Sequence, residues 1–429
     1  MKFLVKHPTR GCPERFGQTA NQWLRRTSGV NRVHFQFTID VDDQPSIEEA
    51  EKLRAHPEIT NGKNTLEILV VPSRGKIAAC NAGIQLDTGG GWDVVILASD
   101  DFTPEVFGWD ETIRRAMQWH FPALDGFLHF PDAYTAYERF ATIPVMGVNL
   151  WRRWGYIYHP DYKSLWCDRE QTEVVGALRK NQFIDLPIFQ HRHRGQTPDE
   201  TYNRNNLFWK QDEETYKRRK KAGFGIRQPD LSILVCALDS RRHFSDVLLP
   251  QIYKQIFSLA DHNRVELHVL LDQKRFTVGA KRNILMSRAR GKFSCFIDDD
   301  DRIAPDYVAS VLKAIDGVAR ADCVVFNGQF SMDGANLLKF DYDLKYRAYR
   351  NTATLYERTP NHLCPIRTDL ACKIKFPEQN KNEDTEFARR IRPLLRTQAV
   401  CCNSDGSKKT LYFYDFSSTG TETQKLKAA

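Results

Sequence analysis

The sequence predicts two tandem α/β domains, each a mostly parallel β-sheet flanked by helices. Apolar stretches of strand length alternate with amphipathic stretches of helical length along most of the 429 residues. The same order of stretches begins a second time after a basic segment. In each half one apolar stretch ends in a run of aspartates. This alternation favours right-handed βαβ units with parallel strands.

In the first half, the pattern indicates four strands and an early helix. The strands are predicted at 2–8, 33–43, 65–73 and 92–101, and the helix at 46–56. The fourth strand ends at Asp100 and Asp101. A short helical segment, "GKIAACNAG", precedes it, and an acidic segment, "CDREQTE", follows much later.

The second half repeats this order. Strands are predicted at 231–240, 265–272 and 293–301, and helices at 244–261 and 278–290. Asn81 precedes Asp100 by 19 residues, and Asn283 precedes Asp300 by 17. The acidic segment "NEDTEF" again comes last. We therefore expect two related domains, 1–215 and 231–429, joined by a basic linker at 216–230.

Composition supports a folded protein. The chain is 41% hydrophobic and 11% aromatic, so it can bury more than one core, and disorder is excluded over most of its length. It begins without an apolar segment of secretory length, and its apolar runs fall short of a bilayer span, so we expect a cytoplasmic protein. The ten cysteines show no repeated C-x-x-C spacing, which favours reduced core residues over zinc ligands or disulfides.

The net charge of +8 is concentrated in the segments 216–227 and 389–396. A solvated linker and a helix surface are the simplest interpretations of the two clusters. Such a charge also suits a polyanionic partner, either a sugar nucleotide or DNA.

Four consecutive aspartates, Asp298–Asp301, end the last predicted strand of the second half. In an open parallel sheet the ligand crevice lies at the carboxyl ends of the strands. Crowded carboxylates repel one another, but together they can hold a hard divalent ion, Mg²⁺ or Mn²⁺, which in turn binds a diphosphate. For one or two of them a solvated turn that caps the helix near Pro305 is the alternative.

This half resembles the family 2 glycosyltransferases of the Rossmann-like A-type fold. The resemblance rests on "SILVCALDSR", "TVGAKRNILMSRARGKFSCFIDDDDRIAP" and "NHLCPIRTDLACKIKFPEQNKNEDTEFARRI", in this order. It implies metal-dependent transfer of a hexosyl or pentosyl group from a nucleotide-diphosphate sugar to an acceptor hydroxyl, with inversion. The metal, Mn²⁺ or Mg²⁺, would stabilise the leaving nucleoside diphosphate.

The resemblance also implies roles for single residues. Asp298 and Asp300 occupy the D-x-D positions of the metal site, and Asp299 and Asp301 are neighbours that can exchange roles with them. Glu383 and Asp384 match the Glu-Asp motif, whose aspartate is the general base. The implied donor contacts are Asp272, Lys281, Arg282, Asn283, Asp298 and Asp299.

The first half resembles glycosyltransferase domains of phage genomes and environmental bacteria, so the cytoplasm could be that of a phage host. Ser99 stands where the second half has an aspartate. Asp168 and Glu170 are the base candidates. A histidine after the base motif often completes the metal site of A-type enzymes, which makes His191 or His193 a ligand beside Asp101. The donor contacts predicted for this half are Lys76, Asn81 and Asp100.

The sequence leaves the acceptor open. A glycan or glycoconjugate is the expected acceptor, and a DNA glycosyltransferase acting on hydroxymethylated pyrimidines is the alternative. A third hypothesis is a glycan- or DNA-binding protein with degenerate transferase domains. The aromatic segment 327–362 is either part of an acceptor pocket or a strand pair that packs the core. The donor sugar and the oligomeric state are not indicated.

Overall fold

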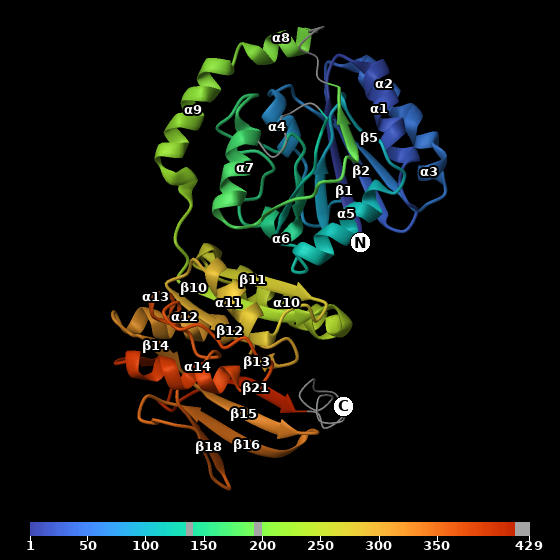
Figure 1. Cartoon of the computed structure of the whole chain (residues 1–429). Coiled ribbons are helices and arrows are strands. Elements are labelled where there is room, and N and C mark those ends of the chain that lie inside the picture. Colours follow the sequence, from blue (N-terminus) through green and yellow to red (C-terminus); the bar gives the residue numbers. More distant parts are fainter. Residues whose placement is uncertain (134–139, 193–199, 417–429) are drawn as a thin grey trace. The chain divides into compact units, whose positions relative to one another are not determined.

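The computed structural model describes residues 1–133, 140–192 and 200–416 (Figure 1). The chain forms two compact units, Met1–Ile226 and Arg227–Ala429. Each unit is a mixed α/β structure with a largely parallel main sheet flanked by helices, which confirms the predicted fold class.

The first unit is built on a seven-stranded sheet in the order β3-β2-β1-β4-β7-β6-β8, and a two-stranded sheet, β5-β9, lies apart from it. Its strands are β1 (Lys2–Thr9), β2 (Arg32–Asp40), β3 (Thr65–Val71), β4 (Val94–Leu97), β5 (Phe102–Pro104), β6 (Phe127–His129), β7 (Val145–Gly147), β8 (Asn181–Phe183) and β9 (Phe189–His191). Its helices are α1 (Pro13–Arg25), α2 (Gln44–Lys52), α3 (Pro57–Thr60), α4 (Lys76–Asn81), α5 (Trp109–His120), α6 (Val148–Trp151), α7 (Cys167–Ala177), α8 (Glu200–Asn206) and α9 (Trp209–Lys221).

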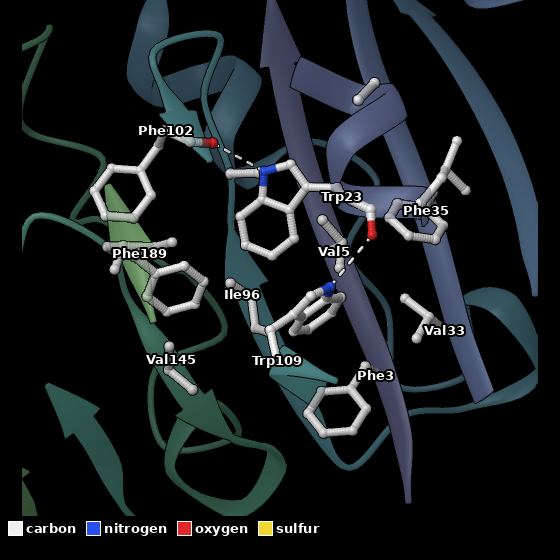
Figure 2. Close-up of a cluster of buried hydrophobic side chains, with 14 of the residues drawn as sticks. Phe3, Val5, Trp23, Val33, Phe35, Ile96, Phe102, Trp109, Val145 and Phe189 are labelled. Carbon is white, nitrogen blue, oxygen red and sulfur yellow. Dashed lines mark hydrogen bonds between the residues drawn. The ribbon is translucent and has the colours of Figure 1, made fainter. Parts of the chain in front are cut away.

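Two tryptophans organise the core of this unit (Figure 2). The rings of Trp23 and Trp109 lie 4.9 Å apart at an interplanar angle of 76°. Trp23 Nε1 donates to the carbonyl of Phe102 at 2.9 Å, and Trp109 Nε1 donates to the carbonyl of Trp23 at 3.2 Å. Both indole N–H groups are thus satisfied inside the core, as burial requires.

The second unit has two six-stranded sheets, β11-β10-β12-β19-β14-β20 and β13-β21-β15-β16-β18-β17. Its strands are β10 (Leu231–Leu238), β11 (Val265–Asp272), β12 (Phe293–Phe296), β13 (Arg302–Ile303), β14 (Cys323–Val325), β15 (Asn327–Met332), β16 (Ala335–Tyr342), β17 (Arg350–Asn351), β18 (Leu355–Arg358), β19 (Ile366–Arg367), β20 (Gln398–Val400) and β21 (Thr410–Phe416). Its helices are α10 (Arg242–Phe257), α11 (Val278–Arg288), α12 (Tyr307–Gly317), α13 (Thr368–Ala371) and α14 (Glu383–Ile391).

The main sheets of the two units share one topology. The order β2-β1-β4-β7-β6-β8 corresponds strand by strand to β11-β10-β12-β19-β14-β20. The first two pairs are parallel, the next two antiparallel and the last parallel in both units. In each unit the carboxyl ends of the first parallel strands therefore lie at one edge, the edge at which open α/β sheets bind their ligands.

The structure differs from the sequence-based prediction at the basic segment 216–230. Residues as far as Lys221 continue helix α9, and the first unit extends to Ile226. Tyr216 is 5% exposed and Asp212 is fully buried, so this helix packs against the unit instead of crossing solvent as a linker. Asp212 accepts hydrogen bonds from the backbone N–H groups of Lys163, Ser164 and Leu165.

Smaller corrections concern element ends and cysteines. The strand predicted at 33–43 ends at Asp40 and the one predicted at 293–301 ends at Phe296, because the acidic residues beyond them turn away from the ladder. All ten cysteines are free, but Cys372 and Cys402 are exposed and do not belong to a core. Within the described residues no helix has both the length and the apolar character that a membrane span needs.

Lys6 is a charged side chain placed inside the first unit. It lies on β1, is fully buried and donates a hydrogen bond to Gln36 Oε1 at 2.8 Å. It also donates to the hydroxyl of Thr38 and to the carbonyl of Ala82, just beyond α4. Burial lowers the pKa of Lys6 from its ordinary 10.5 to about 7.

This lysine should make the stability of the first unit depend on pH. Between about pH 7 and its ordinary pKa of 10.5, the unfolded chain holds the Lys6 proton and the folded chain does not, so the free energy of unfolding rises with pH. Relative to Lys6→Met, the wild type should gain up to ~1.4 kcal/mol per pH unit in this window. Urea denaturation followed by tryptophan emission measures the difference.

Lys210→Met, at an exposed position of the same unit, is the matched control and should differ from the wild type by a constant amount. A constant difference for Lys6→Met as well would show that Lys6 keeps an ordinary pKa in the fold.

Candidate active sites

The four aspartates of the second unit crowd together directly after β12. Oδ2 of Asp299 and Oδ1 of Asp301 are buried and have no hydrogen-bond partner in the described part of the chain. Burial, together with repulsion from Asp300 and Asp298, raises the pKa of Asp299 to about 6. Burial and the same two neighbours raise the pKa of Asp301 well above its usual range. The edge thus holds more carboxyl oxygens than its protein partners satisfy, and their crowding disfavours the charged forms.

Two arginines supply positive charge at this edge. Arg241, which follows β10, places Nη2 2.7 Å from Asp299 Oδ1 and 2.9 Å from Asp300 Oδ2. Arg282, on α11, donates to Asp298 Oδ1 at 3.0 Å. Although burial opposes it, Arg282 holds the pKa of Asp298 below its usual range. Neither arginine reaches the two unpaired carboxylate oxygens.

A divalent cation fits this donor set. Carboxylate oxygens are the ligands that Mg²⁺ and Mn²⁺ prefer, and buried oxygens without partners gain from one. Asp298 and Asp300 keep 35% and 23% of their side chains exposed, so they are the accessible members of the cluster. Among the described residues no three His, Cys, Asp or Glu side chains are already grouped as a metal requires, so the carboxylates would have to exchange arginine contacts for the ion.

Arg282 links the aspartates to the helix of the predicted base. Its side chain is 4% exposed, and its guanidinium lies 5.6 Å from the ring centroids of both Phe296 and Phe376. Its Nη1 donates to Glu383 Oε1 at 2.8 Å, at the start of α14. Although burial opposes it, Asp298, Glu383 and Asp384 contribute to a raised pKa of Arg282. Glu383 is therefore committed to this ion pair, while the half-buried Asp384 next to it remains accessible.

Two further side chains of the second unit complete the edge. Tyr412, on β21, donates from its hydroxyl to Asp301 Oδ2 at 2.6 Å and accepts from the backbone N–H of Asp298 at 3.1 Å. His362 Nε2 lies 3.5 Å from Asp298 Oδ2. Tyr412, His362 and Arg241 were not predicted as site residues. Arg241 and His362 lie within stretches that carry the family resemblance, but the resemblance implied no role for them, and Tyr412 lies outside those stretches.

Two other residues of this unit, Asp272 and Lys281, were predicted to contact the nucleotide sugar. Asp272 ends β11 and accepts from the backbone N–H groups of Arg275 and Phe276 at 3.1 and 3.3 Å. Lys281 Nζ lies 3.9 Å from Asp272 Oδ2, and both side chains are buried.

The two predicted asparagines serve the backbone. Asn283 donates to the carbonyl of Phe376 and accepts from its N–H, both at 2.9 Å. Asn81 donates to the carbonyl of Tyr158 at 2.7 Å and accepts from its N–H at 3.2 Å. In both units the amide thus clamps the loop that leads to the acidic helix. Both amide groups are thus engaged with the backbone, whereas the sequence predicted that Asn81 and Asn283 contact the nucleotide sugar.

The first unit contains a cavity of about 350 Å³ at the carboxyl ends of β1, β2 and β4. It brings together five of the residues predicted for this half, Lys76, Asp100, Asp101, Asp168 and His191. Asn81 and Glu170 do not line it. Glu170 is 4% exposed and accepts from Arg219 and from the hydroxyl of Tyr162, so it holds α7 against its neighbours. His193 lies outside the described residues.

The acids of this cavity have distinct partners. Asp100 contacts His7 Nε2 and accepts from Thr9 Oγ1, both at 2.9 Å. Asp101 accepts from Ser99 Oγ at 2.6 Å and lies 3.5 Å from His191 Nε2. The other ring nitrogen, Nδ1, lies 3.4 Å from Asp132 Oδ2.

The surroundings of His191 and Asp168 raise the pKa of both side chains. Although burial lowers it, hydrogen bonds to Asp101 and Asp132 raise the pKa of His191 to about 9. A metal-ligating imidazole must be neutral, so His191 would have to release this proton before it and Asp101 held a cation, with the Asp132 carboxylate orienting the ring. Burial raises the pKa of Asp168, which favours a proton acceptor at neutral pH.

Sequence analysis missed Asp40 and Arg10 in this cavity. Asp40 ends β2 in the same way that Asp272 ends β11. Arg10 contacts the carboxylates of both Asp40 and Asp42. The signal was present, because the stretch "FTID" ends in an acid as "HVLLD" does.

Comparison with known proteins supports the sequence resemblance. Residues 249–370 match the family model described as glycosyl transferase family 2. The matched segment includes β11, α11, β12 and the four aspartates. No curated protein matches the chain.

Several solved structures match parts of the chain at low identity and low TM-score. TarS 1–349 of S. aureus in complex with UDP is 20% identical with a TM-score of 0.32, over 44% of this chain and 61% of that one. The same protein with UDP-GlcNAc is 17% identical with a TM-score of 0.32, over 46% and 60%. The mannosyltransferase PcManGT from Pyrobaculum calidifontis, in complex with GDP-Man and Mn²⁺, is 12% identical with a TM-score of 0.38, over 52% and 64%.

The chain thus spans less than two thirds of each of these proteins. Over residues 249–370 the second unit is similar to the family 2 glycosyl transferases, which confirms the resemblance found in the sequence.

Proposed function

We propose that the chain transfers a sugar from a nucleotide-diphosphate donor to an acceptor hydroxyl, with its reaction centre in the second unit. The observation that carries this proposal is the cluster Asp298–Asp301, which has unpaired buried oxygens and lies within the segment that matches the family model. Arg282 connects this cluster to the helix that begins with Glu383 and Asp384.

Different residues act on the acceptor hydroxyl and on the leaving nucleoside diphosphate. Asp384 accepts the proton of the acceptor hydroxyl as that oxygen attacks the anomeric carbon in a single inverting displacement. The transition state has oxocarbenium character. Arg282 bonds to both Glu383 and Asp298, and these contacts fix the position of α14 relative to the aspartates. A divalent ion on Asp298 and Asp300 would supply counter-charge for the departing nucleoside diphosphate.

Slow hydrolysis of the donor in the absence of an acceptor tests this proposal. The full chain, incubated with a panel of UDP-, GDP- and dTDP-sugars and Mn²⁺ or Mg²⁺, should release a nucleoside diphosphate, and EDTA should stop the release. Chromatography of the nucleotides measures it. If no nucleotide sugar is bound or hydrolysed with either metal, the proposal is wrong and a degenerate binding protein is favoured.

A glycan acceptor fits the charge distribution better than DNA does. The basic residues of α9 are paired within the first unit: Arg219 with Glu170 at 2.8 Å, Arg218 with Asp161 at 2.9 Å and Lys220 with Glu173 at 2.8 Å. Arg389 and Arg390 pair with Glu386 at 2.8 and 2.6 Å. The α9 cluster is therefore largely paired with carboxylates, whereas in the segment 389–396 a single carboxylate serves two arginines. Sugar transfer to DNA with hydroxymethylated pyrimidines, with strongly salt-dependent binding, would favour the DNA alternative instead.

The cavity of the first unit favours a second candidate function, a bifunctional chain with two transferase centres. Lys76, Asp101, Asp168 and His191 converge there at the end of the same strand order as in the second unit. Among the described residues the ammonium of Lys76 has no hydrogen-bond or ion-pair partner, which leaves it available to a phosphate.

Asp101→Ala should then remove one of two nucleotide sites. Calorimetry with the nucleoside diphosphate of the active donor should give two sites per chain for the wild type and one for the variant. The product made by the variant should stop one sugar short of the wild-type product, as measured by mass spectrometry.

Asp87→Ala is the matched control, because Asp87 is exposed and does not line the cavity. A complete product made at the normal rate by Asp101→Ala would assign the first unit to a supporting role.

A further inference from the structure

The second unit carries an insertion next to its reaction centre. Between β14 and β19 the chain forms β15, β16, β17 and β18, residues 326–365, which join the sheet that also contains β13 and β21. The corresponding connection of the first unit, between β6 and β7, is residues 130–144, and its described residues contain no strand. Because the main sheets of the two units share one topology, we expect the insertion to have a function that is specific to the second unit.

Four aromatic side chains gather on the sheet that contains the insertion, and they are here called the aromatic patch. Phe330 and Tyr356 belong to the insertion, and Tyr414 and Phe416 lie on β21. The ring of Phe330 lies 5.5 Å from Tyr414, 5.8 Å from Tyr356 and 6.4 Å from Phe416. Tyr414 is 37% exposed, and the other three are half-buried. Aromatic rings gathered at a partly exposed surface are typical of a binding site.

The aromatic patch continues the face of the sheet that touches the aspartates. Tyr412 and Tyr414 are two residues apart on β21, so both point to the same face. Tyr412 is buried and bonds to Asp301, whereas Tyr414 pairs with Phe330 farther along the sheet. The phenyl ring of Phe340 fills the place of a side chain at Gly328, where an added Cβ would meet it at 1.8 Å. One face of the sheet thus carries both Tyr412, which bonds to the aspartate cluster, and the more exposed Tyr414.

The charges around the patch restrict its ligand. Burial and the carboxylates of Asp301, Asp298, Asp300 and Asp384 raise the pKa of Tyr414, which places this ring within electrostatic reach of the cluster and of the proposed base. These carboxylates would repel a polyanion such as DNA. The guanidinium of Arg358 lies 4.9 Å from the ring centroid of Tyr356, and it donates to the backbone carbonyls of Glu357 and Arg350.

We propose that the aromatic patch is the acceptor subsite and that it stacks a pyranose ring of an uncharged glycan. The C–H face of a pyranose is apolar and packs on an aromatic ring, while its hydroxyl groups stay in water. A ring stacked on Tyr414 and Phe330 extends along the sheet face toward Asp384, which takes the proton of the attacking hydroxyl. This inference rests on the proposed function, because it names the acceptor class of the same reaction centre.

Saturation-transfer NMR tests the subsite without a donor. The full chain is mixed with neutral oligosaccharides of glucose, mannose, galactose, xylose or N-acetylglucosamine, and at least one should bind. Tyr414→Ala should weaken that binding about fivefold or more, because the stacked ring is lost. Tyr414→Phe keeps the ring and should restore binding to within about twofold of the wild type. Melting temperatures show that each variant is folded.

Leu337→Ala is the matched control: Leu337 is 63% exposed on β16 of the same sheet, and its substitution should leave oligosaccharide binding unchanged. Equal binding by Tyr414→Ala and the wild type, or preferred binding of duplex DNA or heparin, would overturn the inference. So would a wild type that hydrolyses its donor but binds none of the oligosaccharides. Absence of donor hydrolysis together with oligosaccharide binding would refute the proposed function and leave the subsite standing.

Discussion

Asp300→Ala should abolish turnover of the nucleotide sugar and weaken its binding in the presence of Mn²⁺. Asp300 is an accessible member of the cluster, and without it the diphosphate loses a carboxylate that would hold its counter-ion. The variant also removes one of the two carboxylates that Arg241 contacts and leaves it paired with Asp299. Turnover is measured as release of nucleoside diphosphate, and binding by calorimetry with Mn²⁺ and with EDTA.

Two further variants separate the loss of charge from misfolding. Asp300→Asn keeps the shape of the side chain and should lose metal-dependent binding as well. Asp246→Ala, at a position with 62% of its side chain exposed on α10, should behave as the wild type. Normal turnover by Asp300→Ala would refute the assignment of this carboxylate to the donor site.

Asp384→Asn should lower the turnover rate by roughly 10²-fold or more and leave donor affinity nearly unchanged. The amide keeps the size and shape of the carboxylate and one acceptor oxygen, but it takes no proton from the acceptor hydroxyl. Single-turnover rates with an active acceptor measure the first quantity, and calorimetry with the donor measures the second.

Glu386→Gln, on the same helix, is the control, because within the described parts of the chain the ion-pair partners of Glu386 are the exposed Arg389 and Arg390. Glu383→Gln should behave differently from Asp384→Asn, since Glu383 bonds to the buried Arg282 and its loss disturbs the donor side too. If Asp384→Asn loses donor binding together with rate, Asp384 is a structural residue.

The local pattern of the sequence was enough to predict the fold class and the edge at which the acids gather. Apolar runs with acidic ends mark buried parallel strands, and parallel strands bring those ends to one edge. Asp298–Asp301, Asp101 and Asp168 could be found in this way because each follows a strand or begins a helix. The duplication was visible for the same reason.

Contacts between distant segments could not be predicted. Arg241, His362 and Tyr412 reach the aspartates from three separate parts of the chain. Asn81 and Asn283 matched a motif, but their amides bond to backbone groups that lie 77 and 93 residues away. The α9 segment had the composition of a linker, and only its packing through Asp212 and Tyr216 makes it part of the first unit.

The paired indoles of Trp23 and Trp109 belong to a wider asymmetry that is useful in the laboratory. All eight tryptophans of the chain precede residue 227, so the second unit has none of its own. Tryptophan emission is therefore a built-in reporter of the first unit. A change in emission on adding a nucleotide, a glycan or urea can be attributed to Met1–Ile226 without labelling or cutting the chain. A single tryptophan placed in the second unit of an otherwise tryptophan-free chain would give the complementary signal.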